Sequence, residues 1–280
     1  MDRMETKISV IIPTFNRASM VRRAVDSVLK QTFADFELIV VDDGSRDGSL
    51  EQLTNLPDPR LRCVRQEHQG VSAARNHGVH LAQADWIAFL DSDDAWHPKK
   101  LEKQWQFHQA HPELLISQTE DIWIRNGKRV NPHKKHAKKS GRIFVESLEL
   151  CLISPSAVMM NKTLFESLGG FCEDLPACED YDLWLRLTLN HAVGLISEGL
   201  VTRYAGHADQ LSEQCKVLDR YRIKALEKIL PSVNDLALQA KIREILGDKC
   251  TIISKGSLKR GRLLQWLQYY QKSKHYASRL

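Results

Sequence analysis

The sequence predicts an α/β fold in which a mixed, mainly parallel β-sheet is covered by helices on both faces. In the first 90 residues, short apolar runs alternate with segments of helical periodicity. The runs are apolar at nearly every position, which is typical of strands that are buried on both faces. Polar residues follow three of these runs directly. In parallel sheets, ligands bind beyond the carboxyl ends of the strands, so these residues are the first candidates for a site.

The expected elements alternate along the first 110 residues. β-Branched and other apolar residues predict strands at 8–12, 37–41, 61–64 and 86–90. Helices are expected at 21–29, 49–53, 70–81 and 98–110. This repetition of strand and helix is what predicts the parallel order of the first strands.

The second half of the chain is less regular. Strands are expected at 114–118, 122–124, 155–160, 192–197 and 200–204, and helices at 162–168 and from residue 179 onward. Beyond residue 211 only helical spacing is found. The chain is therefore expected to divide into a catalytic domain over 1–211 and a basic helical extension over 212–280.

Composition excludes some classes of protein. No apolar segment reaches the ~18 residues that a membrane-spanning helix needs. The amino terminus lacks the apolar core of a signal peptide, and the six cysteines lack the spacing of a metal site. We therefore expect a cytoplasmic chain with reduced thiols.

The net charge of +5 is unevenly distributed. Segments 125–142 and 255–280 hold eight and seven Lys and Arg, respectively, and no acid. Such patches favour phosphate-rich partners, including anionic lipid headgroups and phosphorylated glycans, although solvated loops carry the same composition. A nucleic-acid partner is not supported, because the basic runs lack interleaved aromatic residues and no known binding motif is present.

A run of carboxylates after the strand at 86–90 is the strongest chemical signal. Asp91, Asp93 and Asp94 lie within four residues, and like charges this close favour an opposing cation. Carboxylate oxygens suit Mg²⁺ or Mn²⁺, which also take phosphate oxygens as ligands. A polar loop that caps the next helix is the alternative. Neither G-x-G-x-x-G nor G-x-x-x-x-G-K-[ST] is present, so a phosphate would be held by metal rather than by a glycine-rich loop.

Three further features of the sequence each have two possible interpretations. Glu179 and Asp180 open a predicted helix, where an acid serves as a general base or as a simple amino-terminal cap. His207 follows the last predicted strand and is a metal ligand or an ordinary surface residue. The segment 263–274 places Leu, Trp and Tyr beside a basic rim, which fits a membrane-interface helix or a helix packed on the domain.

Five motifs together resemble family 2 glycosyltransferases, which have the GT-A fold. The resemblance covers about 8–212, and no departure is seen at the key acids. Its motifs are S-V-I-I-P-T-F-N at 9–16, V-D-D-G-S at 41–45, G-V-S-A-A-R-N at 70–76, F-L-D-S-D-D at 89–94 and E-D-Y-D-L-W-L at 179–185.

The resemblance implies roles for individual residues. Asp43 would pair with the base, Asp91 would lie on the ribose side, and Arg75 would help on the nucleotide side. The DXD residue Asp93 and His207 would hold Mg²⁺ or Mn²⁺. Asp180 would be the catalytic base, with Glu179 as an acceptor contact or a substitute base. The implied nucleotide-sugar-binding set is Pro13, Thr14, Asn16, Asp43, Arg75, Asp91 and Ser92.

The implied activity is metal-dependent hexosyl transfer with inversion. The donor would be a nucleotide-diphospho-sugar, above all a UDP-sugar, and the acceptor a hydroxyl of a glycan or a lipid-linked glycan. Bacterial surface polysaccharide or lipopolysaccharide synthesis would be the setting, in the cytoplasm and peripheral to the inner face of the membrane. The alternatives are a non-catalytic nucleotide-sugar- or glycan-binding module and a membrane-associated assembly protein.

Overall fold

The apolar runs of the first half form the parallel part of one mixed β-sheet. In the computed structural model, which describes residues 6–131, 137–206 and 218–278, β3, β2, β1 and β4 lie side by side and parallel. The sheet continues through β8, β6, β9 and β5, with β7 paired to β6. β8 is antiparallel to both of its neighbours. The strands of this nine-stranded sheet are β1 (Ile8–Thr14), β2 (Phe36–Asp42), β3 (Leu61–Arg65), β4 (Trp86–Phe89), β5 (Ala95–Trp96), β6 (Ile116–Arg125), β7 (Lys128–Val130), β8 (Val158–Asn161) and β9 (Gly194–Ala205).

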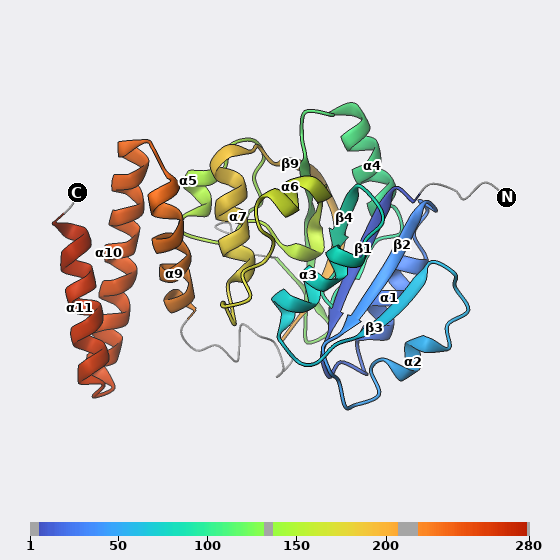
Figure 1. Ribbon diagram of the computed structural model, residues 1–280, viewed down its shortest axis with the longest axis horizontal. Coiled ribbons are helices and arrows are strands. Elements are labelled where there is room, and N and C mark those ends of the chain that lie inside the picture. The colour runs from blue at the N-terminus through green and yellow to red at the C-terminus, as the bar shows by residue number, and fades with distance from the viewer. Residues whose placement is uncertain (1–5, 132–136, 207–217, 279–280) are drawn as a thin grey trace.

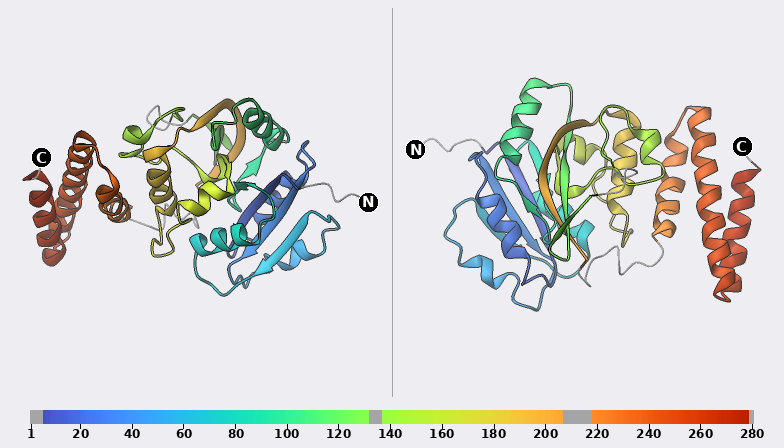
Figure 2. Two further views of the ribbon diagram at one scale, coloured as in Figure 1. Left: turned by 45° about the horizontal axis from the view of Figure 1, so that its top comes forward. Right: turned by 180° about the vertical axis from the view of Figure 1, so that it is seen from behind.

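Helices cover both faces of the sheet, as the two opposite views show (Figures 1 and 2). The α-helices are α1 (Val21–Leu29), α2 (Glu51–Thr54), α3 (Val71–Leu81), α4 (Lys100–Ala110), α5 (Phe144–Ser147), α6 (Lys162–Ser167), α7 (Glu179–Asn190), α9 (Asp219–Ile229), α10 (Leu236–Lys259) and α11 (Leu263–Ala277). Short 3₁₀ helices are η2 (Pro155–Ala157) and η3 (Leu230–Ser232).

β1 illustrates why these runs become buried strands. Ile11 packs into a core shared with α3 and α7, whereas its neighbours Val10 and Ile12 pack into a second core under α1 and α4. Successive side chains of a strand point to opposite faces, so a strand between two helical layers must be apolar throughout. All three residues are completely buried.

α3 lies unusually close to β1 because of Gly78. A Cβ built on Gly78 would lie 2.5 Å from Ile11 Cγ2, well inside van der Waals contact. The glycine therefore lets the helix approach the strand, and this approach fixes the position of Arg75 one turn earlier on α3.

Three of the expected strand boundaries are wrong. The strand expected at 155–160 begins only at Val158, because Pro155–Ala157 form η2. The segments expected as separate strands at 114–118 and 122–124 form the single strand β6, and those at 192–197 and 200–204 form the single strand β9. The two strands pair in parallel, with register shifts on either side of Glu120. At these irregularities the pairing passes over Ser197 and Glu198 of β9, so the strand continues beyond these polar residues.

The helical extension packs on α7. Leu183 and Trp184 of α7 face the sheet core, whereas Tyr181 and Leu185 face a third core formed with α5, α9 and α10. α9, α10 and α11 lie side by side at the end of the molecule away from the amino terminus (Figure 1). Among the described helices, none combines the length and the apolar character needed to cross a bilayer. The proposed boundary at 211 and 212 lies outside the described residues.

Candidate active site

The polar ends of three parallel strands meet at one edge of the sheet. The register pairs Thr14 at the end of β1 with Asp42 at the end of β2. The backbone N–H of Asp43 donates to the carbonyl of Thr14 at 2.8 Å, and that of Leu90, just before Asp91, donates to the carbonyl of Ile11 at 3.0 Å. The loops that follow β1, β2 and β4 therefore open onto a common edge, as parallel order requires.

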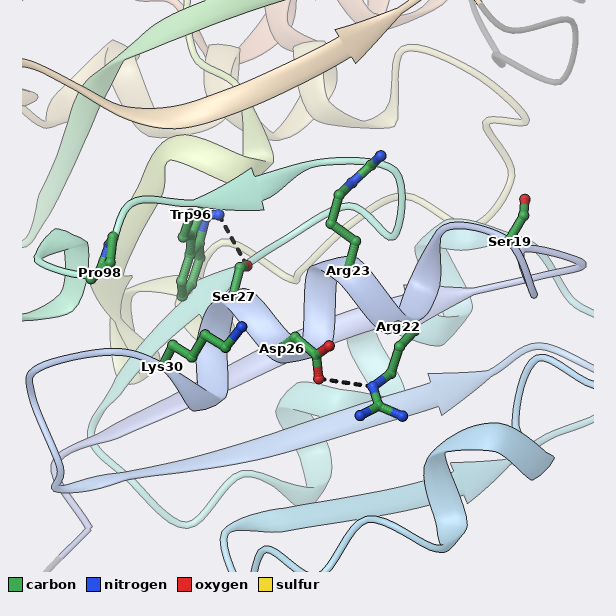
Figure 3. A pocket seen from close by; sticks show the side chains of 8 residues that line it. All are labelled: Ser19, Arg22, Arg23, Asp26, Ser27, Lys30, Trp96 and Pro98. Atoms are coloured by element: carbon green, nitrogen blue, oxygen red, sulfur yellow. Dashed lines mark hydrogen bonds and ion pairs between the residues drawn. The ribbon is translucent and has the colours of Figure 1, made fainter.

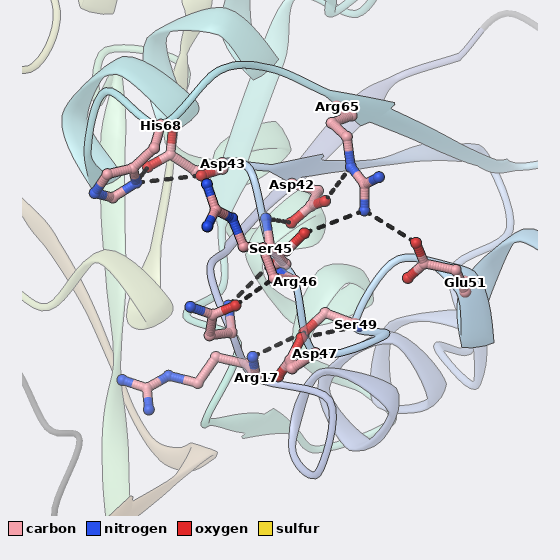
Figure 4. A network of polar contacts seen from close by, with 11 residues as sticks. Arg17, Asp42, Asp43, Ser45, Arg46, Asp47, Ser49, Glu51, Arg65 and His68 are labelled. Carbon is pink, nitrogen blue, oxygen red and sulfur yellow. Dashed lines mark hydrogen bonds and ion pairs between the residues drawn. The ribbon is translucent and has the colours of Figure 1, made fainter.

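The carboxylate of Asp43 organises the loop that leads into α3. It is almost fully buried and accepts hydrogen bonds from the backbone N–H groups of Gln69 and Gly70, at 2.9 and 2.8 Å. The side chain of Gln66 approaches it to 2.8 Å. The ring of His68 also lies 2.8 Å from it (Figure 4). Since Gly70 is the residue before α3, Asp43 fixes the start of the helix that carries Arg75.

A second network joins the loops after β1 and β2. Asn16, in a left-handed conformation with φ of 50°, accepts a hydrogen bond from the backbone N–H of Arg46 at 2.9 Å. Its own N–H donates to the hydroxyl of Ser45 at 2.9 Å, and Asp42 accepts from the N–H of Ser45 and from Arg65 (Figure 4). Asn16 is thus held as a loop-forming residue at the site edge.

An aromatic pair and an orphaned hydroxyl lie beside these loops. The rings of Phe15 and His68 stack with centroids 4.0 Å apart, and Phe15 is 39% exposed although it is a large apolar residue. Thr14 Oγ1 is buried without a hydrogen-bond partner among the described residues. Pro13, also buried, lies inside β1, opposite Val41 of β2. A flat exposed ring and a buried polar atom without a partner are features that a bound ligand can complete.

Asp91, Asp93 and Asp94 form a compact carboxylate cluster. Each offers one oxygen, and these oxygens lie within 4.8 Å of one another. Ser92, between them, is buried. The set consists only of oxygen donors, which fits Mg²⁺ or Mn²⁺ better than a metal that prefers nitrogen or sulfur.

Asp94 is the buried member of the cluster. Its Oδ2 accepts a 2.6 Å hydrogen bond from the hydroxyl of Ser156, and Arg203 lies 3.8 Å away. Burial raises the pKa of Asp94 to about 8; the charge of Arg203 opposes this, and those of Asp93 and Asp91 add to it. A divalent cation among the three carboxylates would relieve their repulsion, so the residues present fit the metal that the family resemblance implies.

A buried arginine connects this cluster to α7. Arg75 Nη2 donates to Asp91 Oδ1 at 2.6 Å, and Nη1 donates to Glu179 Oε1 at 2.7 Å. The guanidinium also lies 5.0 Å from the ring centroid of Phe171. Burial alone would lower the pKa of Arg75, but the charges of Asp91 and Glu179 raise it overall. Arg75 is therefore a permanent cation between two acids from distant segments.

The first turn of α7 holds the candidate base. Asp180 is half-buried and accepts a hydrogen bond from the thiol of Cys151 at 3.4 Å. Burial, together with the charge of Asp180, raises the pKa of Cys151 well above its usual range, so this group remains a thiol donor. For Glu179, burial and the nearby Asp180 raise the pKa, although Arg75 opposes them. Cys178, the residue before α7, has a left-handed backbone with φ of 61°.

Strain at Cys178 aims the start of α7. A left-handed conformation is unfavourable for a residue with a side chain, and such strain persists where the surrounding structure enforces it. Here the backbone turns into α7 so that Glu179 points to Arg75 and Asp180 points to Cys151.

Arg23 of α1 supports the cluster from the other side. It donates to the backbone carbonyl of Asp93 at 2.6 Å and lies 3.7 Å from the ring centroid of Tyr204 on β9. A groove of about 530 Å³ runs along α1 next to it, lined by Arg22, Asp26 and other residues (Figure 3). This groove lies beside the carboxylate cluster rather than on it, and Arg22 is already paired with Asp26 at 2.8 Å.

The structure brings the predicted residues into one region, with one exception. His207 lies outside the described residues, so its predicted metal contact stays a prediction. Sequence reasoning missed Phe15, His68, Cys151, Ser156 and Arg203. Phe15 could have been predicted, because it is a large apolar residue between Thr14 and Asn16, two of the predicted ligand-binding residues. The other four act through partners that are distant in sequence.

Comparison with known proteins shows clear relatives. The sequence model of the family described as "Glycosyl transferase family 2" matches residues 9–169. An uncharacterized glycosyltransferase of Rickettsia felis is 34% identical over 70% of this chain and 32% of its own length. The chain thus spans about a third of the length of that relative.

A shorter relative and a solved structure extend the comparison. The Escherichia coli protein WfgD, named UDP-Glc:alpha-D-GlcNAc-diphosphoundecaprenol beta-1,3-glucosyltransferase, is 32% identical over 69% of this chain and 74% of its own length. The mannosyltransferase PcManGT of Pyrobaculum calidifontis, solved with GDP-Man and Mn²⁺, superimposes with a TM-score of 0.66 over 98% of this chain and 85% of its own. At 15% sequence identity, this likeness concerns the fold.

Proposed function

Because the chain belongs to glycosyl transferase family 2, we propose that it transfers a sugar from a nucleotide-diphospho-sugar to an acceptor hydroxyl, with inversion at the anomeric carbon. One observation carries the proposal. Arg75 binds Asp91 of the carboxylate cluster with one Nη and Glu179, the neighbour of Asp180, with the other. This link supports the proposal that a group suited to hold a diphosphate through a cation and a group suited to take a proton act on the same substrate, which a direct displacement needs.

Asp180 is the proposed general base. It accepts the proton of the acceptor hydroxyl while the oxygen of that hydroxyl bonds to the anomeric carbon. The bond between this carbon and the β-phosphate oxygen breaks, and the nucleoside diphosphate leaves from the opposite face. The thiol of Cys151 supports this role, because its hydrogen bond orients one carboxylate oxygen of Asp180. Glu179 is held by Arg75 and is proposed to contact the acceptor.

The diphosphate end of the donor is proposed to lie at the carboxylate cluster. Asp91, Asp93 and Asp94 are the residues that would hold Mg²⁺ or Mn²⁺, with His207 as a further proposed ligand. A bound divalent ion would neutralise the charge that develops on the leaving diphosphate. Arg75 and Arg23 hold the loop of the cluster in place through Asp91 and the carbonyl of Asp93.

The nucleoside end is proposed to lie over the loops after β1 and β2. Phe15 offers an exposed ring on which a base can stack, and Thr14 Oγ1 offers a buried polar atom without a partner among the described residues. Asp43 is proposed to face the base. Its carboxylate oxygens already contact four groups, of which His68 is the exposed one. A base that binds Asp43 is therefore proposed to displace His68. We propose uridine as the nucleoside, because the name of WfgD specifies UDP-Glc.

The acceptor is proposed to be a lipid-linked glycan of a bacterial surface polysaccharide. The support is the name of WfgD, which acts on a GlcNAc-diphosphoundecaprenol. With such an acceptor, the enzyme is proposed to act at the cytoplasmic face of a membrane, as a peripheral protein.

A nucleotide-sugar screen tests the proposed function. The purified chain is incubated with UDP-, GDP- and dTDP-sugars, with Mn²⁺, Mg²⁺ or EDTA, and release of nucleoside diphosphate and thermal stability are measured. Metal-dependent release with at least one donor is expected. Thermal stabilisation by a donor without any release or transfer would instead identify a non-catalytic nucleotide-sugar-binding module.

A further inference from the structure

We propose that the turn between α10 and α11 is a docking site for an anionic lipid bilayer. The hairpin tip is defined here by the exposed residues Ile252, Lys255, Leu258, Lys259, Arg260, Arg262, Leu263, Leu264 and Leu267. Lipid binding by this surface does not depend on sugar transfer, and only its link to the acceptor rests on the proposed function.

The apolar part of the hairpin tip is exposed to an unusual degree. Leu264 is 88% exposed, Leu263 62% and Ile252 61%. Although α11 packs along α10, none of its residues reaches full burial. Leu263 and Leu267 stand one helical turn apart and share a face with Tyr270, which is also exposed. Several exposed apolar side chains gathered at one helical turn are typical of an interaction site, whereas exposed single leucines are not.

The charge of the hairpin tip selects the kind of partner. Lys255, Lys259, Arg260 and Arg262 lie close to the leucines in the sequence, and no acid follows Asp248. Within the described part of the chain, none of these four cations has an ion-pair partner. Apolar side chains beside a cationic rim match an interface of acyl chains and anionic headgroups.

A second copy of this chain fits the surface less well. In a symmetric dimer the same patch meets itself, so each group of four cations would face another group of four. Like charges placed together across an interface oppose association. The observations therefore favour an anionic lipid surface over self-association.

The direction of the hairpin places such a bilayer next to the candidate active site. α10 and β1 run in the same sense, so the hairpin tip and the carboxyl ends of β1 and β2 lie at the same edge of the molecule, the lower edge in Figure 1 and in the view from behind in Figure 2. A membrane that contacts the hairpin tip would therefore face the edge that carries the carboxylates. A sugar acceptor anchored in that membrane would reach the candidate active site from this side.

Vesicle co-sedimentation tests the proposal directly, with the full chain and without donor or metal. Phosphatidylcholine vesicles are compared with vesicles that contain phosphatidylglycerol in addition. We expect sedimentation with the anionic vesicles and its loss at high salt, because screening shortens the range of the attraction. The variant K259Q/R260Q should bind about 25-fold more weakly, at about fivefold per cation. The variant L263Q/L264Q should lose about tenfold or more, because its apolar contact is gone.

Matched controls come from the opposite edge of the molecule. Leu236 is 78% exposed at the other end of α10, and Lys30 is exposed at the carboxyl end of α1. L236Q and K30Q should bind the vesicles as the unmodified chain does. Equal binding by the hairpin-tip variants and these controls overturns the proposal. Self-association is measured by sedimentation velocity. If L263Q/L264Q loses self-association while its vesicle binding is unchanged, the proposal is also overturned. Donor turnover in solution is measured in parallel, and its absence would count against the proposed function and not against lipid docking.

Discussion

Arg75 donates a 2.7 Å hydrogen bond to Glu179, a residue 104 positions away in the sequence. The arginine is 4% exposed, and its other Nη group binds Asp91 at 2.6 Å. A buried cation with two acidic partners avoids the free-energy cost of an unpaired buried charge. The same contact sets the carboxylate cluster after β4 at a fixed position relative to the first turn of α7.

Replacing Arg75 by Met should lower both stability and activity. Two acids would lose their cation, and breaking a buried ion pair from one side costs about 3–5 kcal/mol. Urea denaturation measures the free energy of unfolding. R75K should recover part of it, because an ammonium restores the charge but cannot bind both acids in the same geometry. An R75M variant within 1 kcal/mol of the unmodified chain would contradict this account.

Replacing Asp180 by Asn should reduce kcat by about 10²- to 10⁴-fold, the usual contribution of a general base. The KM for the donor should change little, because Asp180 is proposed to act on the acceptor. Initial rates at varied donor concentration separate the two parameters. C151S is the matched control, since a hydroxyl still donates to the carboxylate. Near-normal turnover by D180N would remove Asp180 from the proposed role.

Divalent metal should stabilise the folded chain as well as support activity. A ligand at 100 times its dissociation constant adds about 2.7 kcal/mol to the free energy of unfolding. Differential scanning fluorimetry with Mn²⁺ and with EDTA measures this effect without any donor. In D93N the apparent metal affinity should fall at least about tenfold. A metal response that D93N leaves intact would place the ion elsewhere.

Replacing Phe15 by Ala should weaken donor binding. Stacking of a base on an aromatic ring is worth about 1–3 kcal/mol, so the KM for the donor should rise between about fivefold and 150-fold. F15Y keeps the ring and should behave like the unmodified chain. Phe33 also contacts another aromatic ring, that of Trp105 on α4, but it packs against the core under α1 and α4. F33A should therefore reduce stability without a selective rise in KM.

Acidification should destabilise the fold through His108. Burial lowers the pKa of His108 from its ordinary value of 6.5 to about 4. The ring hydrogen-bonds with the carbonyl of Leu114 at 3.0 Å and with the hydroxyl of Ser117 at 2.9 Å. Below pH 6.5 the unfolded chain binds a proton that the folded chain does not. The contribution of His108 to the free energy of unfolding is therefore fully present above pH 6.5 and is lost as the pH falls to 4.

The non-titrating variant H108Q isolates this contribution. Its free energy of unfolding at neutral pH should lie below that of the unmodified chain. The difference should narrow by about 3 kcal/mol between pH 7 and pH 4, since one pKa unit corresponds to about 1.4 kcal/mol. Parallel pH profiles for the two proteins, measured by urea denaturation, would show that His108 does not titrate in this range.

Most of the parallel half of the sheet could be predicted, because its signal is local. The runs at 8–12 and 37–41 are apolar at every position or nearly so, which only a doubly covered strand tolerates. β6 and β9 were harder. Their continuity depends on the irregular pairing around Glu120. This pairing is a property of both strands together, so the sequence of either segment alone does not predict it.

The candidate site divides in the same way. Asp91, Asp93 and Asp94 predict a cation site because they lie within four residues of the sequence. The residues that contact Asp94 could not be predicted in this way. Ser156 belongs to η2 and Arg203 to β9, and both are distant from Asp94 in the sequence.

The sequence by itself determined the alternating layers, the carboxylates after β4 and the acids that open α7, because each depends on residues within a few positions of one another. Only the tertiary structure decided that Arg75 joins two of these acids, that Cys151 contacts Asp180, and that the leucines at 263 and 264 remain uncovered. The physical reason is that hydrogen bonds, ion pairs and burial act between groups close in space. Which distant segments become close is settled by the packing of the whole chain.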